Sequence, residues 1–250
     1  MNNNKFILSW DIGMKNLAYC LMDNNKQIYK WSIIDVMPNI HNCYHFKCYN
    51  EVIHQILFLN VNIYSCSKHN PFDKLKKYDN NVSIKKYNVI NCNNINIDLL
   101  RENVIRSLNL DILFLCYFYK INYVLIENQP AMKNPKMKAI MDIIYSWFLI
   151  KCKIDCSIID EIKLINPSNK LKKYLIELKD KDKDNDVDKI KNDKKKYKET
   201  KNKSIEVVES YLNKSTDNNR QFLYNLWTSK KKDDLCDCLL QAHYWIDNYL

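Results

Sequence analysis

The sequence predicts an α/β domain built around a mixed β-sheet, and three observations lead to this expectation. Three apolar segments of strand length follow one another near the amino terminus. Two further segments of strand length come later, and each follows a stretch with apolar residues at helical spacing. A length of 250 residues, 46% of them apolar, suits one α/β domain that carries insertions.

The first three expected strands form an antiparallel meander. They cover Lys5–Ile12, Leu17–Asp23 and Gln27–Asp35, with a polar turn of the hairpin kind before the third strand. The chain then alternates helix and strand, which favours a sheet flanked by helices. The later expected elements are a helix over Asp98–Tyr119, a strand over Asn122–Glu127, a helix over Lys136–Cys152, a fifth strand over Ile154–Asp160, and helices over Ser204–Leu212 and Lys232–Tyr249.

Two segments interrupt this pattern. Residues from about 37 to 96 are polar, rich in Asn and irregular, with one apolar patch, and we interpret them as an insertion on the domain. Residues from about 179 to 196 are dominated by lysine and aspartate, which is typical of a solvated, flexible loop.

The composition excludes several classes of function. The chain has a single glycine, Gly13, so neither a Walker A loop nor a dinucleotide-binding fingerprint can be built. An actin-like ATPase is disfavoured for the same reason. No apolar stretch approaches the roughly 18 residues needed to span a bilayer, and the amino terminus does not have the pattern of a signal peptide. We therefore expect an intracellular protein with reduced cysteines and no membrane partner.

The charge balance favours a polyanionic partner. There are 39 Lys and Arg residues against 29 Asp and Glu residues, a net charge of +10. Such an excess can steer a protein toward phosphates, although it also serves solubility.

Four carboxylates are candidates for chemistry. Asp11 and Glu127 stand at the carboxyl ends of the first and fourth expected strands, which become neighbours if the two strands lie side by side. Asp234 and Asp237 are three residues apart near the start of the last helix and therefore share one face. Clustered carboxylates suit Mg²⁺ or Mn²⁺, and two such ions can catalyse phosphodiester hydrolysis. From spacing alone, the more ordinary explanations are favoured, because acidic residues are common at strand ends and an acidic helix start often only compensates the helix dipole.

Several segments together resemble the RuvC-like Holliday junction resolvases, most closely the mitochondrial and poxvirus-type branch with its relatives from large DNA viruses. The segments are SWDIGMKNLAYCLMD, YVLIENQP, KNPKMKAIMDIIYSWF, NPSNKL and KKDDLCDCLLQA. The resemblance covers both ends and the middle of the chain in the same order, but it leaves out most of the insertion and the lysine-rich loop.

This resemblance implies an RNase H-like fold with a mixed five-stranded sheet, formed by one resolvase domain over residues 1–250. It also implies a homodimer that nicks two opposing strands of a four-way junction symmetrically, with two Mg²⁺ ions per active site. The four metal ligands and catalytic residues would be Asp11, Glu127, Asp234 and Asp237. Asp233 stays open as an alternative to Asp234, since it is four residues from Asp237 and lies on nearly the same face.

Polar and basic residues near these carboxylates are candidates for contacts with DNA phosphates, although solvated turns and surfaces would use the same residue types. The candidates are Lys15, Asn16, Asn128, Gln129, Lys133, Lys136, Lys138, Lys170 and Lys201.

The insertion contains a second pattern of ligand residues. Cys43 and Cys48 form a C-x₄-C pair, and Cys66 and His69 form a C-x₂-H pair. These spacings are compatible with a structural zinc site, although scattered cysteines in an Asn-rich segment can also arise from composition.

The expected function is therefore a Mg²⁺-dependent endodeoxyribonuclease that resolves Holliday junctions in recombination or repair. Two alternatives keep the fold: a nuclease acting on other branched DNA or on RNA–DNA hybrids, and a catalytically silent junction-binding protein. The absence of an obvious transit peptide favours a viral protein at a cytoplasmic replication site over a mitochondrial one.

Overall fold

The computed structural model describes residues 4–37, 45, 48, 54–86, 95–130, 132, 134–169 and 189–250, with the backbone alone for residues 62 and 189–198. The chain divides into two compact units. The first, called the main unit, consists of Met1–Val36 and Ile97–Leu250. The second, called the inserted unit, consists of Met37–Asn96.

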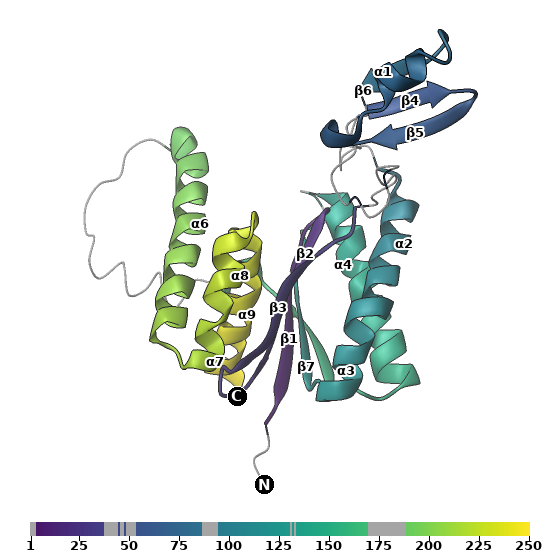
Figure 1. Cartoon of the computed structure of the whole chain (residues 1–250). Coiled ribbons are helices and arrows are strands. Elements are labelled where there is room, and N and C mark those ends of the chain that lie inside the picture. Colours follow the sequence, from purple (N-terminus) through teal and green to yellow (C-terminus); the bar gives the residue numbers. More distant parts are fainter. Residues whose placement is uncertain are drawn as a thin grey trace. The chain divides into compact units, whose positions relative to one another are not determined.

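The main unit contains a mixed five-stranded sheet with the strand order β3-β2-β1-β7-β8 (Figure 1). β1, β2 and β3 pair antiparallel, whereas β7 and β8 run parallel to β1. This order and these directions confirm the predicted RNase H-like fold. The strands are β1 (Phe6–Ile12), β2 (Asn16–Asp23), β3 (Ile28–Asp35), β7 (Tyr123–Glu127) and β8 (Glu161–Ile165).

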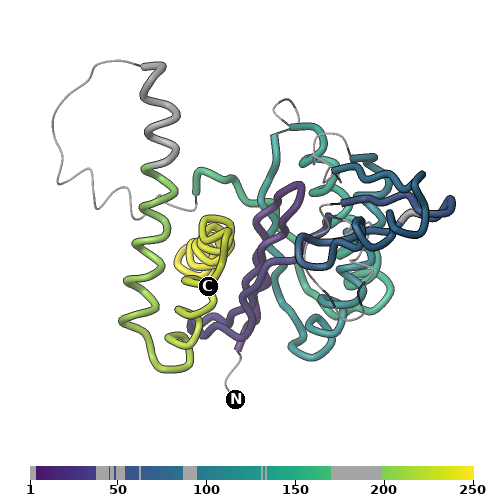
Figure 2. The backbone as a smooth tube through the Cα atoms, turned by 45° about the horizontal axis from the view of Figure 1, so that its top comes forward, coloured from purple at the N-terminus to yellow at the C-terminus, as the bar shows by residue number. Residues whose placement is uncertain are grey.

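Helices cover both faces of this sheet, and Figures 1 and 2 show α6 and α9 on one face and α2 and α4 on the other. The first group is α6 (Lys189–Lys214), α7 (Asp217–Arg220), α8 (Phe222–Thr228) and α9 (Lys232–Tyr249). The second group is α2 (Ile97–Ser107), α3 (Leu113–Tyr119) and α4 (Pro135–Trp147), with short 3₁₀ turn Pro167–Asn169 following β8. Burying both faces of the sheet explains why its central strands are apolar almost throughout.

Two of the expected helices contain π-helical segments. α2 continues through a π-helix, Leu108–Ile112, into α3. Asn134 caps the amino end of α4, and its side chain accepts a hydrogen bond from the Met137 backbone amide at 3.2 Å. The helix then continues into a second π-helix, Phe148–Asp155.

This second π-helix makes the predicted fifth strand wrong. The segment Ile154–Asp160 alternates apolar and polar residues like a strand, but its first residues belong to the π-helix and the Ile158 amide donates to Cys152. The fifth strand is β8 instead. It is an edge strand, so it needs no continuous apolar run and its sequence gave a weak signal.

The flexible loop expected over about 179–196 is also wrong in its second part. α6 begins at Lys189, so residues 189–196 are helical. Lysine and glutamate are good helix formers, so a highly charged segment can extend a helix that is anchored by packing further along. Residues 179–188 lie outside the described residues.

The inserted unit contains a second, small antiparallel sheet with the order β5-β4-β6, where the sequence suggested irregular structure. Its elements are β4 (His54–Phe58), β5 (Val61–Ser65), a 3₁₀ turn (Ser67–His69), α1 (Phe72–Lys76) and β6 (Ser83–Lys86). In the part of the chain that the structure describes, no helix combines the length and apolar character needed to cross a bilayer.

Candidate active site

Asp11 and Glu127 lie at the carboxyl ends of two neighbouring parallel strands. The register pairs Trp10 of β1 with Ile126 of β7, so Asp11 and Glu127 are the next residues in line. Residues opposite each other on parallel strands point to the same face of the sheet. Both side chains are nearly buried, each with 9% of its surface exposed. Two carboxylates therefore meet at the same edge of the sheet.

The face to which they point is the one covered by α9. Ile7 and Leu125, which share the strand alternation of Asp11 and Glu127, belong to the apolar core that includes Leu239 and Ala242 of α9. Trp10, the neighbour of Asp11 on the opposite face, contacts Phe148 instead, with ring centroids 6.0 Å apart.

The turn that follows Asp11 requires the single glycine of the chain. A Cβ atom on Gly13 would lie 2.6 Å from the backbone oxygen of Asn16, which is too close for any side chain. Because β1 and β2 stay paired up to Ile12 and Leu17, this tight connection fixes the end of β1. The position of Asp11 is thus determined by the hairpin as well as by the sheet.

Helix α9 brings two further carboxylates to this edge. It runs antiparallel to β1, since Gln241 contacts Ser9 while Trp245, one turn later, contacts Tyr123 near the start of β7. Its first turns therefore lie beside the carboxyl end of β1. Asp234 and Asp237 are half-buried and share one face of the helix.

A buried amide fixes α9 against the two central strands. The Nε2 atom of Gln241 lies 3.1 Å from Ser9 Oγ, 3.2 Å from the Trp10 carbonyl and 3.4 Å from the Leu125 carbonyl. Gln241 and Ser9 are fully buried. Gln241 follows Asp237 by one helical turn. Its hydrogen bonds therefore fix the position of the α9 carboxylates, along the helix axis, relative to β1 and β7.

The electrostatics of the site place Asp234 close to Asp11. Burial, followed by the charges of Asp11 and Asp233, raises the pKa of Asp234 from 3.8 to about 6. The positive charges of Lys231 and Lys201 oppose this shift. A half-buried carboxyl group beside a second carboxylate has the environment of a cation site.

Asp233, the alternative ligand, is bound to a lysine. Lys201 of α6 forms an ion pair and hydrogen bond with the Asp233 carboxylate. Burial alone would raise the pKa of Asp233, but the hydrogen bond and charge of Lys201 outweigh it and lower this pKa below its ordinary value. The geometry therefore favours Asp234 over Asp233 as the residue that completes the set with Asp11.

The donor set fits Mg²⁺ or Mn²⁺. All four candidates, Asp11, Glu127, Asp234 and Asp237, offer hard carboxylate oxygens from elements that converge at one edge of the sheet. Among the described residues, the carboxylates do not form a group whose ligand atoms all lie within 4.8 Å of one another, whereas Cys48, Cys66 and His69 do.

Lys15 and Asn16 belong to the hairpin beside Asp11. Lys15 forms an exposed ion pair with Asp35 at 3.6 Å, and Asn16 is the first residue of β2. Exposed pairs of this kind are weak, so Lys15 can exchange its partner for a phosphate at little cost.

The other candidates for DNA contacts follow β7 or lie on α6. Asn128 is exposed, and its amide donates to Ile165 at 2.8 Å, whereas Gln129 is buried beside Met141. Lys136 and Lys138 lie in the first turn of α4, where Lys138 pairs with Asp142 at 2.7 Å. Lys201 pairs with Asp233, as described above, and Lys133 and Lys170 lie outside the described residues.

No protein-family model matches the chain. The chain is similar to protein L451 of Acanthamoeba polyphaga mimivirus, an uncharacterized protein. The two are 29% identical over 320 aligned positions, which cover 96% of this chain and 74% of that protein. Among solved structures, the chain is similar to the yeast mitochondrial Holliday junction resolvase Ydc2. That likeness has a TM-score of 0.47 and 14% identity, and it covers 97% of this chain and 79% of that chain.

The sequence analysis missed two features of the site. One is Gln241, and the other is the ion pair between Lys201 and Asp233. Gln241 left a signal that could have been used: it is a polar residue on the apolar face of α9, one turn after Asp237. The ion pair left none, because it joins two helices that are separated by the turns around α7 and α8.

Proposed function

We propose that the protein is a Mg²⁺-dependent endonuclease that resolves four-way DNA junctions by paired, symmetric nicks. The observation that carries this proposal is the convergence of Asp11, Glu127 and the Asp234 and Asp237 pair at one edge of an RNase H-like sheet. The motifs around these residues, which resemble those of RuvC-like resolvases, support a four-way junction as the substrate.

The four carboxylates would hold two divalent ions. Such ions supply, when bound, activation of the attacking water and neutralisation of the charge that develops on the leaving oxygen. Asp11 and Glu127 would be held in fixed positions, because each lies at the carboxyl end of a buried strand. Asp234 and Asp237 approach from α9, whose height is set by Gln241. Lys201 neutralises Asp233 and thereby keeps one further negative charge from competing in the cluster.

Recognition of DNA would depend on phosphates and on the shape of the junction. The net charge of +10 supports binding to a polyanion, and we expect Lys15, Lys136 and Lys138 to contact phosphates of the DNA backbone. Contacts of this type carry little sequence information, so they suit a nuclease that selects a branched structure.

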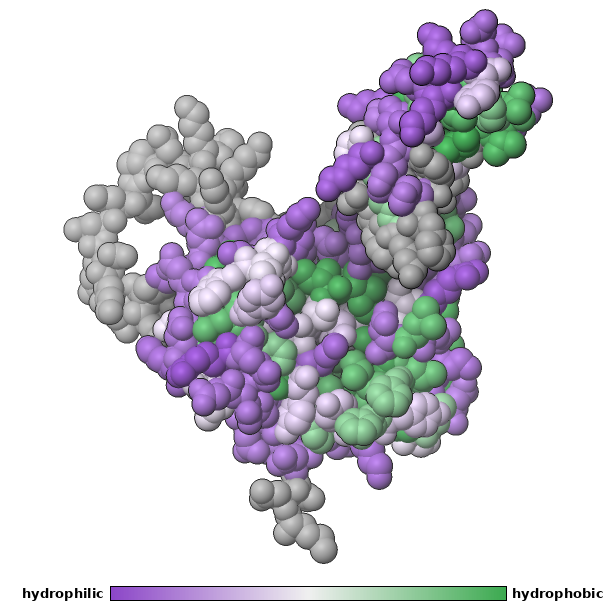
Figure 3. Space-filling view, viewed as in Figure 1, coloured by the Kyte–Doolittle hydropathy of each residue, from purple (hydrophilic) through white to green (hydrophobic). Residues whose placement is uncertain are grey.

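Symmetric paired nicks require two active sites related by a twofold axis, and thus a homodimer. One surface of the main unit supports this: Leu110, Phe114 and Phe118 are 67–80% exposed, and the last two stack at 5.9 Å. Figure 3 shows apolar side chains on the surface in the region of α3. A pocket of ≈ 690 Å³ adjoins this face, and it is lined by Leu110 and Phe114 together with the charged residues Lys30, Asp35 and Asp111. Phe114→Glu should convert the dimer to a monomer in analytical ultracentrifugation and turn paired nicks into single ones; a variant that stays dimeric would move the interface elsewhere.

The test of the proposed activity is a synthetic four-way junction incubated with the protein in Mg²⁺ or in EDTA, beside linear duplex and RNA–DNA hybrid. Asp237→Asn should remove cleavage. Asp247→Asn is the matched control, since Asp247 lies on the same helix but pairs with Lys26 at 2.5 Å, far along α9 from the cluster. Paired nicks confined to the junction are expected for the wild type and for Asp247→Asn.

The alternatives give different outcomes in the same assay. Cleavage of the hybrid in place of the junction would keep the metal site but replace the substrate. Junction binding without cleavage in any metal would support a silent binding protein. For the setting of the activity, the similarity to a mimivirus protein supports a viral replication site in the host cytoplasm over a mitochondrion.

A further inference from the structure

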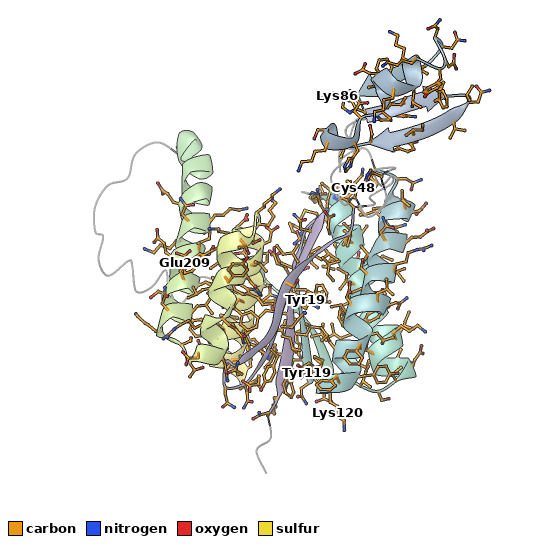
Figure 4. The ribbon with its side chains drawn as sticks, in the orientation of Figure 1. Tyr19, Cys48, Lys86, Tyr119, Lys120 and Glu209 are labelled. Carbon is orange, nitrogen blue, oxygen red and sulfur yellow. The ribbon has the colours of Figure 1, made fainter. Side chains whose placement is uncertain are left out.

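A thiol and imidazole cluster in the inserted unit is separate from the carboxylates. Cys48, labelled in Figure 4, lies with its Sγ atom 3.9 Å from Cys66 Sγ. The same Cys66 sulfur lies 3.4 Å from Nδ1 of His69. The three ligand atoms are all within 4.8 Å of one another. We infer that Cys48, Cys66 and His69 bind a structural zinc ion that holds the inserted unit together.

The distances within the cluster fit tetrahedral zinc. With Zn–S bonds of about 2.3 Å and Zn–N bonds of about 2.0–2.1 Å, tetrahedral angles place two sulfurs about 3.8 Å apart and a sulfur about 3.5 Å from a nitrogen. The observed separations of 3.9 Å and 3.4 Å match these values. A disulfide between Cys48 and Cys66 does not, since it requires the sulfurs to be about 2.05 Å apart.

The local backbone presents these ligands together. Cys66 follows β5 directly and is 1% exposed, and Ser67–His69 form a 3₁₀ turn in which the His69 amide donates to the Cys66 carbonyl at 3.3 Å. This turn brings the His69 ring back toward the sulfur of Cys66. At the second sulfur ligand, the Cys48 amide donates to the His45 carbonyl at 3.1 Å. The 3₁₀ turn therefore fixes His69 relative to Cys66, and the hydrogen bond to His45 holds the backbone at Cys48.

His45 supports the imidazole ligand. Its ring stacks on His69 with centroids 4.0 Å apart and an angle of 12° between the planes. Stacking of this kind restricts the rotation of the His69 ring. The set of two thiolates and one imidazole is borderline soft, which suits Zn²⁺ and not the Mg²⁺ proposed for the carboxylates. The sequence pattern gives Cys43 as the fourth ligand, but Cys43 lies outside the described residues.

The inserted unit has a reason to need such an ion. Among its described residues, the buried hydrophobic side chains are Ile56, Cys66, Val82 and Ile95. Other large apolar residues are exposed at the β4–β5 hairpin, namely Leu57, Leu59 and Val61. The few side chains that are buried among these described residues gain little from the hydrophobic effect, and small units commonly depend on a metal or on disulfides. Binding of zinc would supply folding free energy directly.

The test measures metal in the purified full-length protein by mass spectrometry, without added zinc. About one zinc ion per chain is expected for the wild type. Cys66→Ser and His69→Ala should lose it, whereas His69→Cys, which restores a ligand, should retain it. Cys156→Ser is the matched control, since Cys156 is half-buried in the main unit and accepts a hydrogen bond from Tyr117. Replacement of zinc by Co²⁺ should give the absorption of a tetrahedral site with thiolate ligands.

Two further measurements separate this site from the proposed active site and from misfolding. Asp237→Asn should keep its zinc, because the carboxylates are not its ligands. A chelator should make residues of the inserted unit accessible to protease in the wild type while the main unit stays resistant. Absence of zinc and of Co²⁺ thiolate absorption in the wild type would overturn the inference. So would a Cys48–Cys66 disulfide, or zinc that is lost from Asp237→Asn and retained by Cys66→Ser.

Discussion

The two units of the molecule solve the problem of stability in different ways. The main unit buries apolar residues on both faces of its sheet, including Ile7, Leu125 and Leu239 against α9. Few of the described residues of the inserted unit are buried apolar residues, and the sulfur and imidazole groups of Cys48, Cys66 and His69 lie close together. A core of the first kind can tolerate a group of repelling carboxylates at its edge, because the hydrophobic effect there outweighs the repulsion. A unit of the second kind cannot tolerate such repulsion, because its small apolar core contributes too little stability.

The two candidate metal sites also differ in the chemistry of their ligands. The carboxylates of the main unit are hard ligands on strands and a helix that lie far apart in the sequence. A weakly held Mg²⁺ suits a reaction that needs an exchangeable ion. The ligands of the inserted unit are softer and lie on short turns, which suits a permanent zinc ion. Loss of the first metal should therefore stop activity without unfolding, and loss of the second should unfold its unit.

The largest expected effect is on cleavage by Asp11→Asn. Loss of residues that only support metal ligands lowers activity or metal affinity by about 10–100-fold, so loss of a direct ligand should reduce junction cleavage by more than about 100-fold. Asp35→Asn is the control, because Asp35 ends β3 in an exposed ion pair with Lys15. Both variants should keep their zinc. Loss of zinc from Asp11→Asn would show that the two sites are not independent.

Gln241→Leu should separate positioning from ligation. The substitution keeps the size of the side chain but removes the amide that bonds Ser9 and the Trp10 and Leu125 carbonyls. Because a lost buried hydrogen bond costs about 1–3 kcal/mol, the free energy of unfolding in urea should fall by that amount. Exposed Gln221→Leu should change it by less than about 0.5 kcal/mol.

The activity of Gln241→Leu then gives the second readout. If Gln241 fixes the position of Asp234 and Asp237 along the axis of α9, a higher Mg²⁺ concentration should recover part of the lost cleavage, since the ligands themselves are intact. A variant that is destabilised but cleaves normally at every Mg²⁺ concentration would reduce Gln241 to a purely structural residue.

The sequence predicted those parts of the fold that depend on local patterns. The three strands of the meander, β7 and α9 were expected within one or two residues, because each is a strongly apolar or amphipathic segment. β8 was misplaced because an edge strand pairs on one side only and needs no apolar run, while the π-helix before it imitated a strand. The start of α6 was missed because its first turns carry almost no apolar residue.

The same distinction applies to the candidate site. Asp11 and Glu127 could be singled out because strand ends can be located in a sequence, and Asp234 and Asp237 because helical spacing can be counted. The preference for Asp234 over Asp233 could not be derived in this way. It depends on Lys201, which reaches Asp233 only after α6 packs against α9. Contacts of this kind exist in the tertiary structure alone.

The pKa of Asp234 predicts how stability depends on pH when no metal is bound. Its value of about 6 in the folded protein exceeds its ordinary value of 3.8, so the folded state binds the proton more tightly than the unfolded state. Stability is therefore highest below about pH 4 with respect to this group and falls as the pH rises to about 6. Because the carboxylate is only half-buried, we expect about 1–2 kcal/mol, less than the full shift would give.

Thermal unfolding in EDTA at several pH values measures this effect. Asp234→Asn should be more stable than the wild type at pH 7 and equal to it near pH 4, and Mg²⁺ should stabilise the wild type alone. A variant with the same pH dependence as the wild type would assign the effect to another group.

The smallest expected effect comes from Lys201, and it decides between two roles for this residue. The charge of Lys201 lowers the pKa of both Asp233 and Asp234. Lys201→Met should therefore shift the pH of half-maximal cleavage upward at subsaturating Mg²⁺. At a distance of several ångströms in a partly solvated environment, loss of one positive charge raises the pKa of a carboxyl group by about 0.3–0.5 units.

A direct contact between Lys201 and DNA gives a different result. Loss of a phosphate contact weakens junction binding and reduces the slope of log affinity against log salt by about 1, with no shift in the pH profile. Lys203→Met on the same helix is the control for the general loss of positive charge. Because Asp233 already binds Lys201, we expect the pH shift without a change in slope, and the reverse result would make Lys201 a DNA ligand whose pairing with Asp233 exists only in the absence of the junction.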